Sequence, residues 1–173
     1  EIYTLSLHDA LPIWSAIVLL SCLLAGCGGS QTFANEHYEF QYPSDWVLRE
    51  VEGGQVLLPE NKENYQSPNF RIDIYVDRLD EVGGAENFRK YFADYAKYAP
   101  QQDIEVLEQQ VDGNTFRIRS HELITTALVY EIWYLPGGST PAHVITMRYS
   151  TEEPEVEQLQ AVAEQFYQSF KAK

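Results

Sequence analysis

The middle of the chain alternates between apolar and polar residues, which is the period of a β-strand with one buried face. The clearest case is 70–77, where every second residue from Phe70 to Val76 is apolar. Similar patterns predict further strands at 38–42, 46–52, 56–58, 104–111, 115–122, 128–135 and 143–149. Asp112-Gly113 lies between two of these strands and is a strong hairpin signal.

Two segments have helical spacing instead. From about Ala85 to Tyr98, aromatic residues recur every three or four positions, and Pro100 ends the pattern. A second apolar stripe runs from Val156 to Phe170, with Pro154 suited to its first turn. The polar segment 62–68 is expected to be a surface loop, and 28–35 a flexible tether.

The order of these elements indicates the fold class. Several strands are followed by a helix, four more strands and a terminal helix, and the hairpins imply mostly antiparallel pairing. Each helix has one apolar face that must be buried against the sheet. The sequence therefore predicts one α+β domain over 37–173, a mostly antiparallel sheet flanked by helices.

A separate apolar segment precedes this domain, from Ile13 to Ala25. Its length fits a signal-peptide core of about 7–15 residues and falls short of the ~20 that span a bilayer. Its end, Leu24-Ala25-Gly26-Cys27, closely resembles the bacterial lipobox. That resemblance implies that Leu24, Ala25 and Gly26 are read by the signal peptidase and that Cys27 carries the lipid. We expect 14–26 to be a lipoprotein signal peptide and 27–36 the lipid-attachment site and tether; the alternative is a short buried helix with two chance cysteines.

The front of this leader lacks the basic residues of a signal peptide. The first Lys or Arg of the chain is Arg49, while Glu1 and Asp9 are acidic. Residues 1–13 resemble translated sequencing-adapter DNA. We therefore interpret 1–13 as an artefact and exclude it, with His8, from the functional argument.

Three segments of 37–170 resemble the PsbP-like superfamily. They are the entry strand 38–46 with Tyr42-Pro43 and Trp46, the Asp112-Gly113 hairpin, and the closing Ser169-Phe170, in the family's order. The resemblance implies an antiparallel sheet flanked by helices. Family members include a photosystem II extrinsic subunit, a Ran-binding nuclear-transport factor and many bacterial lipoproteins of unknown role, and they are typically accessory or binding proteins rather than enzymes.

Composition excludes several functions. The chain has 12 basic and 26 acidic residues, a net charge of −14. It lacks the basic footprint of a nucleic-acid-binding protein and is not attracted to anionic lipid headgroups. Both cysteines, Cys22 and Cys27, lie in or at the end of the leader. The domain itself thus has no thiol for disulfides, metal binding or nucleophilic catalysis.

Candidate metal ligands are not arranged in any known pattern. His37, His121 and His143 lack the spacing of paired ligands, and although the geometry allows a cross-strand contact between His121 and His143, nothing in the sequence supports it. Acidic clusters at 73–81 and 152–157 lack the glycine and spacing of a calcium loop. The second cluster is expected at the N-terminus of the last helix, where negative charge is favourable. We expect no metal and no cofactor.

Aromatic residues are the remaining candidates for a ligand site. The stripe of Phe88, Tyr91, Phe92 and Tyr95 has the spacing of a groove lining, yet such spacing is more often core packing. We expect the same role for Trp46 and Trp133.

The leading hypothesis is a non-catalytic accessory or binding lipoprotein of the bacterial cell envelope. It would be anchored outside the cytoplasm through the lipid on Cys27, with a protein partner and no nucleic acid. One alternative is a photosystem II extrinsic subunit or assembly factor, if the source is photosynthetic. Another is a hydrolase that uses a pair of carboxylates, for which no motif was found.

Overall fold

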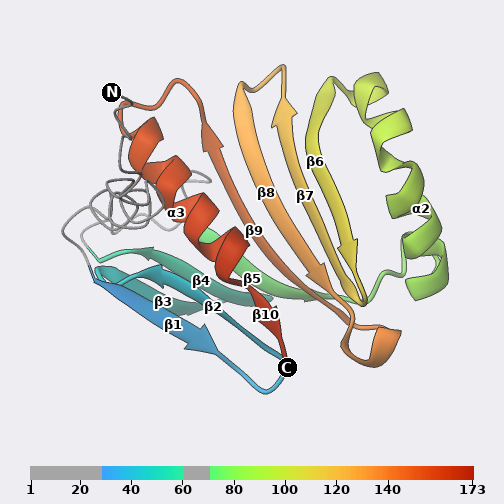
Figure 1. The fold of residues 1–173 in the computed structure, drawn as a ribbon, viewed down its shortest axis with the longest axis horizontal. Helices are drawn as coiled ribbons and strands as arrows, with labels where there is room; N and C mark the ends of the chain where they lie inside the picture. The colour runs from blue at the N-terminus through green and yellow to red at the C-terminus, as the bar shows by residue number, and fades with distance from the viewer. Residues whose placement is uncertain (1–28, 61–70) are drawn as a thin grey trace, which may run out of the picture.

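The computed structural model describes residues 29–60 and 71–173. These residues form two antiparallel sheets, two α-helices and two short 3-10 helices (Figure 1). The predicted α+β class is confirmed. The strands are β1 Ser30–Ala34, β2 Tyr38–Pro43, β3 Trp46–Val51, β4 Gly54–Pro59, β5 Ile72–Asp77, β6 Ile104–Asp112, β7 Thr115–Glu122, β8 Ala127–Tyr134, β9 Ala142–Ser150 and β10 Lys171–Ala172. The helices are α2 Ala85–Tyr98 and α3 Val156–Ser169, with the 3-10 turns η1 Ala99–Gln102 and η2 Pro136–Gly138.

The larger sheet has seven strands in the order β3-β4-β5-β9-β8-β7-β6. Every neighbouring pair is antiparallel, and β6 and β7 join in register at the predicted Asp112-Gly113 turn. The smaller sheet has the order β1-β2-β10. Its last strand follows α3 directly, so the C-terminus is fixed beside β2 (Figure 1).

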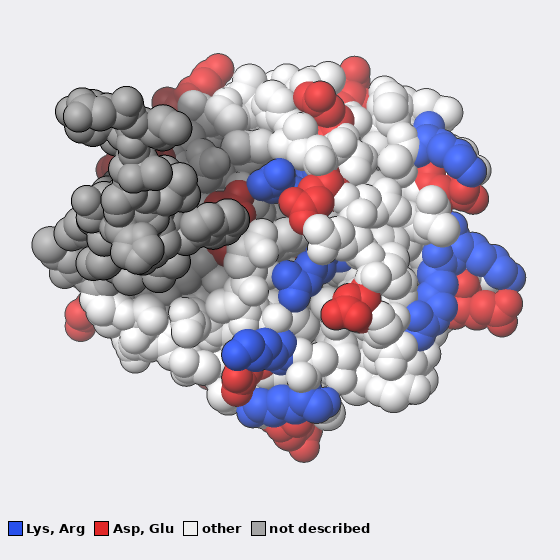
Figure 2. Space-filling model, in the orientation of Figure 1, with Lys and Arg blue, Asp and Glu red and all other residues white. Residues whose placement is uncertain are grey.

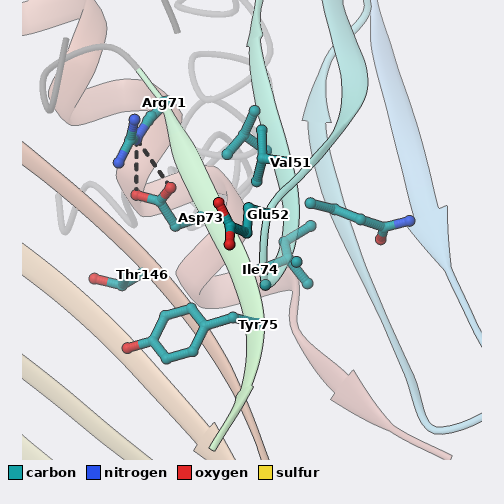
Figure 3. A pocket seen from close by; sticks show the side chains of 11 residues that line it. Val51, Glu52, Arg71, Asp73, Ile74, Tyr75 and Thr146 are labelled. Atoms are coloured by element: carbon teal, nitrogen blue, oxygen red, sulfur yellow. Dashed lines mark hydrogen bonds and ion pairs between the residues drawn. The ribbon is translucent and has the colours of Figure 1, made fainter. Parts of the chain in front are cut away.

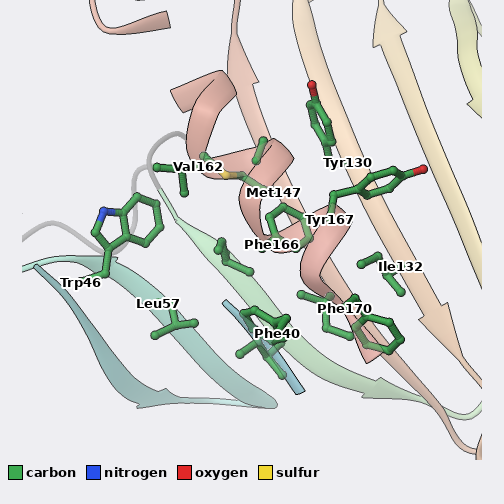
Figure 4. Close-up of a cluster of buried hydrophobic side chains, with 14 of the residues drawn as sticks. Phe40, Trp46, Leu57, Tyr130, Ile132, Met147, Val162, Phe166, Tyr167 and Phe170 are labelled. Atoms are coloured by element: carbon green, nitrogen blue, oxygen red, sulfur yellow. The ribbon is translucent and has the colours of Figure 1, made fainter. Parts of the chain in front are cut away.

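The larger sheet has two faces, which we call the α3 face and the second face. On the α3 face, alternate residues of β5, β8 and β9 point toward α3 and β2 and form one apolar cluster (Figure 4). Phe166 of α3 is fully buried there, with its ring 6.1 Å from that of Phe40 and 6.5 Å from that of Tyr130. The helical stripe predicted from Val156 onward is thus the face that α3 buries.

The second face is covered in part by α2, which begins and ends where the sequence predicts. Its buried side chains, Phe88 and Phe92, pack against Phe116 of β7 with ring centroids 5.2 and 5.1 Å apart. Gln109 of β6 donates a hydrogen bond to the backbone carbonyl of Phe92, which joins the helix to the edge strand. This smaller cluster lies at the β6–β7 end of the sheet.

The structure corrects two details of the sequence interpretation. Residues 30–34 are not a flexible tether, because β1 pairs with β2 and the ring of Phe33 stacks on Phe40 at 5.1 Å. Burial of one aromatic ring on a paired strand outweighs the flexibility that the small residues suggested. Pro154 is also not in the first turn of α3, since the helix begins two residues later.

Other predictions fall outside the described residues, namely the leader with Cys27 and the polar loop at 62–68. In the described ranges, no helix combines the length and apolarity that crossing a membrane requires.

Candidate functional site

A cavity of about 630 Å³ lies where the β3–β4 hairpin meets β5 and β9 (Figure 3). Side chains of the second face form part of its lining, and in Figure 3 Tyr75 points toward Thr146. The described lining residues are Val51, Glu52, Gly53, Gly54, Gln55, Val56, Arg71, Asp73, Ile74, Tyr75 and Thr146.

The β3–β4 hairpin forms one wall of the cavity, and it can lie close to β5 because Gly54 has no side chain. A Cβ at this position would stand 2.3 Å from the carbonyl oxygen of Ile74 and 3.1 Å from the Cβ of Tyr75. The backbone of β4 therefore approaches β5 more closely than any other residue would allow. Val51 and Glu52, from the same hairpin, line the cavity together with Tyr75.

A row of polar side chains crosses the second face next to this hairpin. Asp73 of β5 is paired in register with Thr146 of β9, and Thr146 is paired with Glu131 of β8. Neighbouring strands are about 4.8 Å apart, so the backbones of Asp73 and Glu131 are about 10 Å apart on the same side of the sheet. Long-range strand pairing thus brings together two carboxylates that are distant in sequence.

The two carboxylates have different surroundings. Asp73 is held by Arg71, whose Nε lies 2.9 Å from one carboxylate oxygen and 3.0 Å from the other (Figure 3). Burial raises the pKa of Asp73, and the charge of Arg71 opposes that rise. Asp73 is therefore a positioned, charge-compensated carboxylate.

Glu131 has no such compensation. Burial, and then the negative charge of Glu122, raise the pKa of its carboxyl from 4.5 to about 7. None of the described residues forms an ion pair with it. A carboxyl with this pKa changes its protonation state near neutral pH.

Two tyrosines lie within electrostatic reach of Glu131. Tyr75 approaches from β5, and Tyr95 from α2 on the other side of β8. Burial is the main cause that raises the pKa of each phenol to about 12, and the charge of Glu131 is the next. Both rings are therefore neutral at physiological pH, and each can present an aromatic face or a hydroxyl.

An ion pair between β7 and β9 lies on the same face of the sheet as Glu131. Arg148 of β9 binds Glu122 of β7, and it also donates a 2.9 Å hydrogen bond to Thr125. The positive charge of Arg148 is therefore compensated by the carboxylate of Glu122. The pair fixes the β7–β8 turn rather than neutralising Glu131.

The structure does not bring His121 and His143 together, in line with the absence of any sequence support for that contact. β8 separates β7 from β9, so the geometrically allowed contact between His121 and His143 does not form. His143 instead lies beside His37, with ring centroids 4.6 Å apart, and burial followed by the charge of His37 lowers its pKa. Sequence spacing could not reveal this contact, because His37 lies in the β1–β2 turn and packs against β9 only in the folded chain.

Two other members of the acidic clusters, Asp77 and Glu157, have ordinary structural roles. Asp77 accepts a 2.6 Å hydrogen bond from the backbone N–H of Leu79. Glu157 lies in the first turn of α3, as predicted. Within 29–60 and 71–173, no group of three or more metal-binding side chains converges on one point.

The aromatic candidates pack in the core as expected, apart from Tyr91. Trp46 is buried in the α3-face cluster, and the ring of Trp133 lies 5.1 Å from that of Phe88. Phe88 and Phe92 are core residues, whereas Tyr91 is 41% exposed. Tyr95 packs against the smaller cluster, and the charge of Glu131 also contributes to its raised pKa.

Fold and cavity together define an α+β domain with a polar site on one face of its sheet. Its fold is similar to the Ran-binding protein Mog1p of Saccharomyces cerevisiae, at 12% identity over 83% of this chain and 95% of that one, with a TM-score of 0.51. A point mutant of the protein Mog1 matches with 13% identity, the same coverage and a TM-score of 0.50. The fold that the PsbP-like resemblance implied is confirmed by this similarity.

The cyanobacterial PsbP protein of Synechocystis sp. PCC 6803, CyanoP, matches with 13% identity over 86% of this chain and 95% of that one, with a TM-score of 0.49. No family model matches the sequence. No curated protein matches it either. The photosystem role stays a prediction.

Proposed function

We propose that this chain is a non-catalytic binding domain for a protein partner, tethered to a membrane of the bacterial cell envelope. The observation that carries the proposal is the cavity beside the β3–β4 hairpin, in which strand pairing holds the polar residues Asp73 and Thr146 side by side. Clefts with a few fixed polar groups are the usual form of a recognition site. The fold similarity to Mog1p, a Ran-binding protein by name, supports the same class of function.

The anchoring part of the proposal rests on the sequence. Leu24-Ala25-Gly26-Cys27 ends an apolar leader, and a diacylated cysteine holds a protein stably where one chain is marginal. In Figure 2, acidic and basic side chains alternate over the described part of the visible face, and they form no continuous basic patch there. Lipid, rather than surface charge, would therefore supply the membrane affinity.

Site-specific photo-crosslinking in cells tests the binding surface. A benzophenone side chain at Glu52, on the rim of the cavity, should join the domain to one partner that mass spectrometry identifies. The matched control is the same side chain at Gln160, which is exposed on α3. Equal yields at the two positions, or none at Glu52, would contradict the proposal.

Palmitate labelling tests the anchor. A gene that starts with Met-Lys before residue 14 should give a labelled protein in the membrane fraction of a bacterial host. Cys27→Ala should abolish the label and release the protein from membranes, while Cys22→Ala should keep both. Label retained in Cys27→Ala would disprove lipidation at this residue.

The hydrolase alternative is the second candidate, because Asp73 and Glu131 face the same side of the sheet. Inverting glycosidases use carboxyls about 6.5–9.5 Å apart, one of them with a raised pKa. A panel of oligosaccharides should then be cleaved by the wild type and not by Glu131→Gln. Absence of turnover at pH 5 to 8 would reject this candidate.

A further inference from the structure

The β1–β2 turn contacts the larger sheet through a pair of histidines. His37 of this turn lies against His143 of β9, with ring centroids 4.6 Å apart. The ring of Tyr38, the first residue of β2, lies 5.5 Å from that of His143 and flanks the same contact. Two side chains that can each take up a proton near neutral pH are therefore in direct contact.

The same turn is closed by its own hydrogen bonds. The side chain of Asn35 accepts hydrogen bonds of 2.9 Å from the backbone N–H groups of His37 and Tyr38. Lys173 donates from its backbone N–H to the carbonyl of His37 at 2.9 Å, and from its ammonium to the carbonyl of Asn35 at 2.6 Å, so the C-terminus lies beside this turn (Figure 1). The amide protons of the turn therefore report whether its position against the sheet is kept.

One carboxylate lies beside the histidine pair. An oxygen of Glu36 is 3.1 Å from Nε2 of His37 and compensates a positive charge on that ring. Among the described residues, no carboxylate forms an ion pair with His143. The surroundings therefore compensate a proton on the first ring and leave a proton on the second ring uncompensated.

The other elements around His143 supply no carboxylate either. Its neighbours in register are an apolar residue, Val76 of β5, and a phenol, Tyr134 of β8. Asp77 follows Val76, and its side chain points to the opposite face of the sheet, because successive residues of a strand alternate. The ammonium of Lys173 adds a further positive charge to the turn.

We propose that His37 and His143 form an acid-sensitive latch, which holds the β1–β2 turn against β9 and releases it when both rings are protonated. Neutral rings can lie in contact, whereas two imidazolium groups at this distance repel each other. Burial opposes the charged form as well, so burial, followed by the charge of His37, lowers the pKa of His143.

The direction of the pH dependence follows from this lowered pKa. The contribution of His143 to stability is fully present above its ordinary pKa of 6.5, and it is lost as the pH falls through the lower pKa of the folded chain. In the proposed cell-envelope protein, the latch opens when the surroundings become acidic and loosens the segment that follows Cys27. That consequence rests on the proposed function, whereas the latch itself does not.

Hydrogen exchange of the full chain in detergent micelles, read by mass spectrometry of peptic fragments, tests the latch. After correction for the pH dependence of intrinsic exchange, protection of a fragment that spans 35–40 should fall at least tenfold between pH 7.5 and pH 5. Protection of a fragment within α3 should change less than twofold. His143→Gln should remove the pH dependence at 35–40, because glutamine takes up no proton, and His37→Gln should do the same.

The matched control is His121→Gln, which replaces the remaining histidine of the described residues. His121 lies on β7 with its Nδ1 4.0 Å from Glu105, and its replacement should keep the pH dependence of the wild type. Melting temperatures at pH 7.5 show whether each variant is folded.

Three results would overturn the proposal. They are equal protection of 35–40 at both pH values in the wild type, an undiminished pH dependence in both His143→Gln and His37→Gln, and loss of the pH dependence in His121→Gln. Because exchange is measured without a partner and without palmitate labelling, the proposed function can fail while the latch stands, and the reverse.

Discussion

The two faces of the seven-stranded sheet are built from the same strands but differ in what they hold. On the α3 face, buried apolar side chains run almost without interruption from β4 to α3, and the hydroxyl of Tyr130 at the rim donates a 3.0 Å hydrogen bond to Glu164. On the second face, the apolar cluster is confined to α2 and its neighbours. Beside it lie the Asp73–Thr146–Glu131 row and the cavity.

This difference suggests separate roles for the two faces: the α3 face stabilises the fold, and the second face carries the candidate recognition site. The α3 face removes apolar surface from water and so drives folding. The second face retains Glu131, which has no ion-pair partner among the described residues and whose carboxyl is costly to ionise because it is buried. Groups that cost stability are commonly found at functional sites.

The largest effect is expected from truncation on the α3 face. Phe166→Ala removes a fully buried ring from the centre of the cluster, which should lower the free energy of unfolding by about 3–5 kcal/mol. Urea denaturation measures the change. Gln160→Ala, on the exposed side of the same helix, should change it by less than about 0.5 kcal/mol. Similar losses in the two variants would show that α3 does not seal this face.

A gain of stability is expected on the second face. The carboxyl of Glu131 has a pKa of about 7 in the folded chain and an ordinary value of 4.5. Between these pH values the folded state binds more protons than the unfolded state, so this residue's contribution is fully present below pH 4.5 and is lost as the pH rises through about 7. The loss amounts to about 3 kcal/mol at most.

Glu131→Gln should therefore be more stable than the wild type at pH 8, by up to about 3 kcal/mol, and the two should converge below pH 5. Thermal melts across this range measure the difference, with Glu157→Gln as the control. A lower melting temperature for Glu131→Gln at pH 8 would mean that Glu131 is a structural residue, and the contrast between the faces would be lost.

Local patterns were sufficient for most of the fold. Helical spacing over 85–98 and the Asp112-Gly113 turn depend on neighbours in sequence, and both are found where predicted. β1 was missed because the small residues around 30–34 suggest flexibility, and only the packing of Phe33 on Phe40 makes this segment a strand. β10 is too short for any period to be visible.

The candidate site was harder to predict from the sequence than the fold. Glu131 occupies the polar position of an alternating strand, which usually indicates exposure. Thr146 is paired with it in register, and its charge affects the pKa of Tyr75 and Tyr95; these residues come from three other elements, so their proximity is not visible in the sequence. One signal was present: Val129 and Trp133 make β8 apolar on both faces, so an ionisable residue between them is expected to be at least partly enclosed.

The smallest effect concerns a cation that lies on the α3 face. Arg117 of β7 donates a 2.6 Å hydrogen bond to the carbonyl of Tyr167 and a 3.0 Å bond to that of Phe170, at the C-terminus of α3. Positive charge is favourable at this end of a helix, and the guanidinium satisfies carbonyls that have no partner within it. Arg117 therefore connects β7, which lies next to the edge strand β6, to the end of the helix.

Arg117→Met keeps most of the side chain's apolar stem and removes both hydrogen bonds. It should lower the free energy of unfolding by about 1–3 kcal/mol, less than the loss of the Phe166 ring. Urea denaturation is again the measurement, and Arg49→Met, which replaces an exposed arginine on β3, should have almost no effect. Because Arg117 faces away from the cavity, crosslinking of the partner from position 52 should be unchanged in folded Arg117→Met, and this crosslinking is the measure of binding here. If binding fell together with stability, the two faces would be coupled, and stability and recognition would not be assigned to separate sides of the sheet.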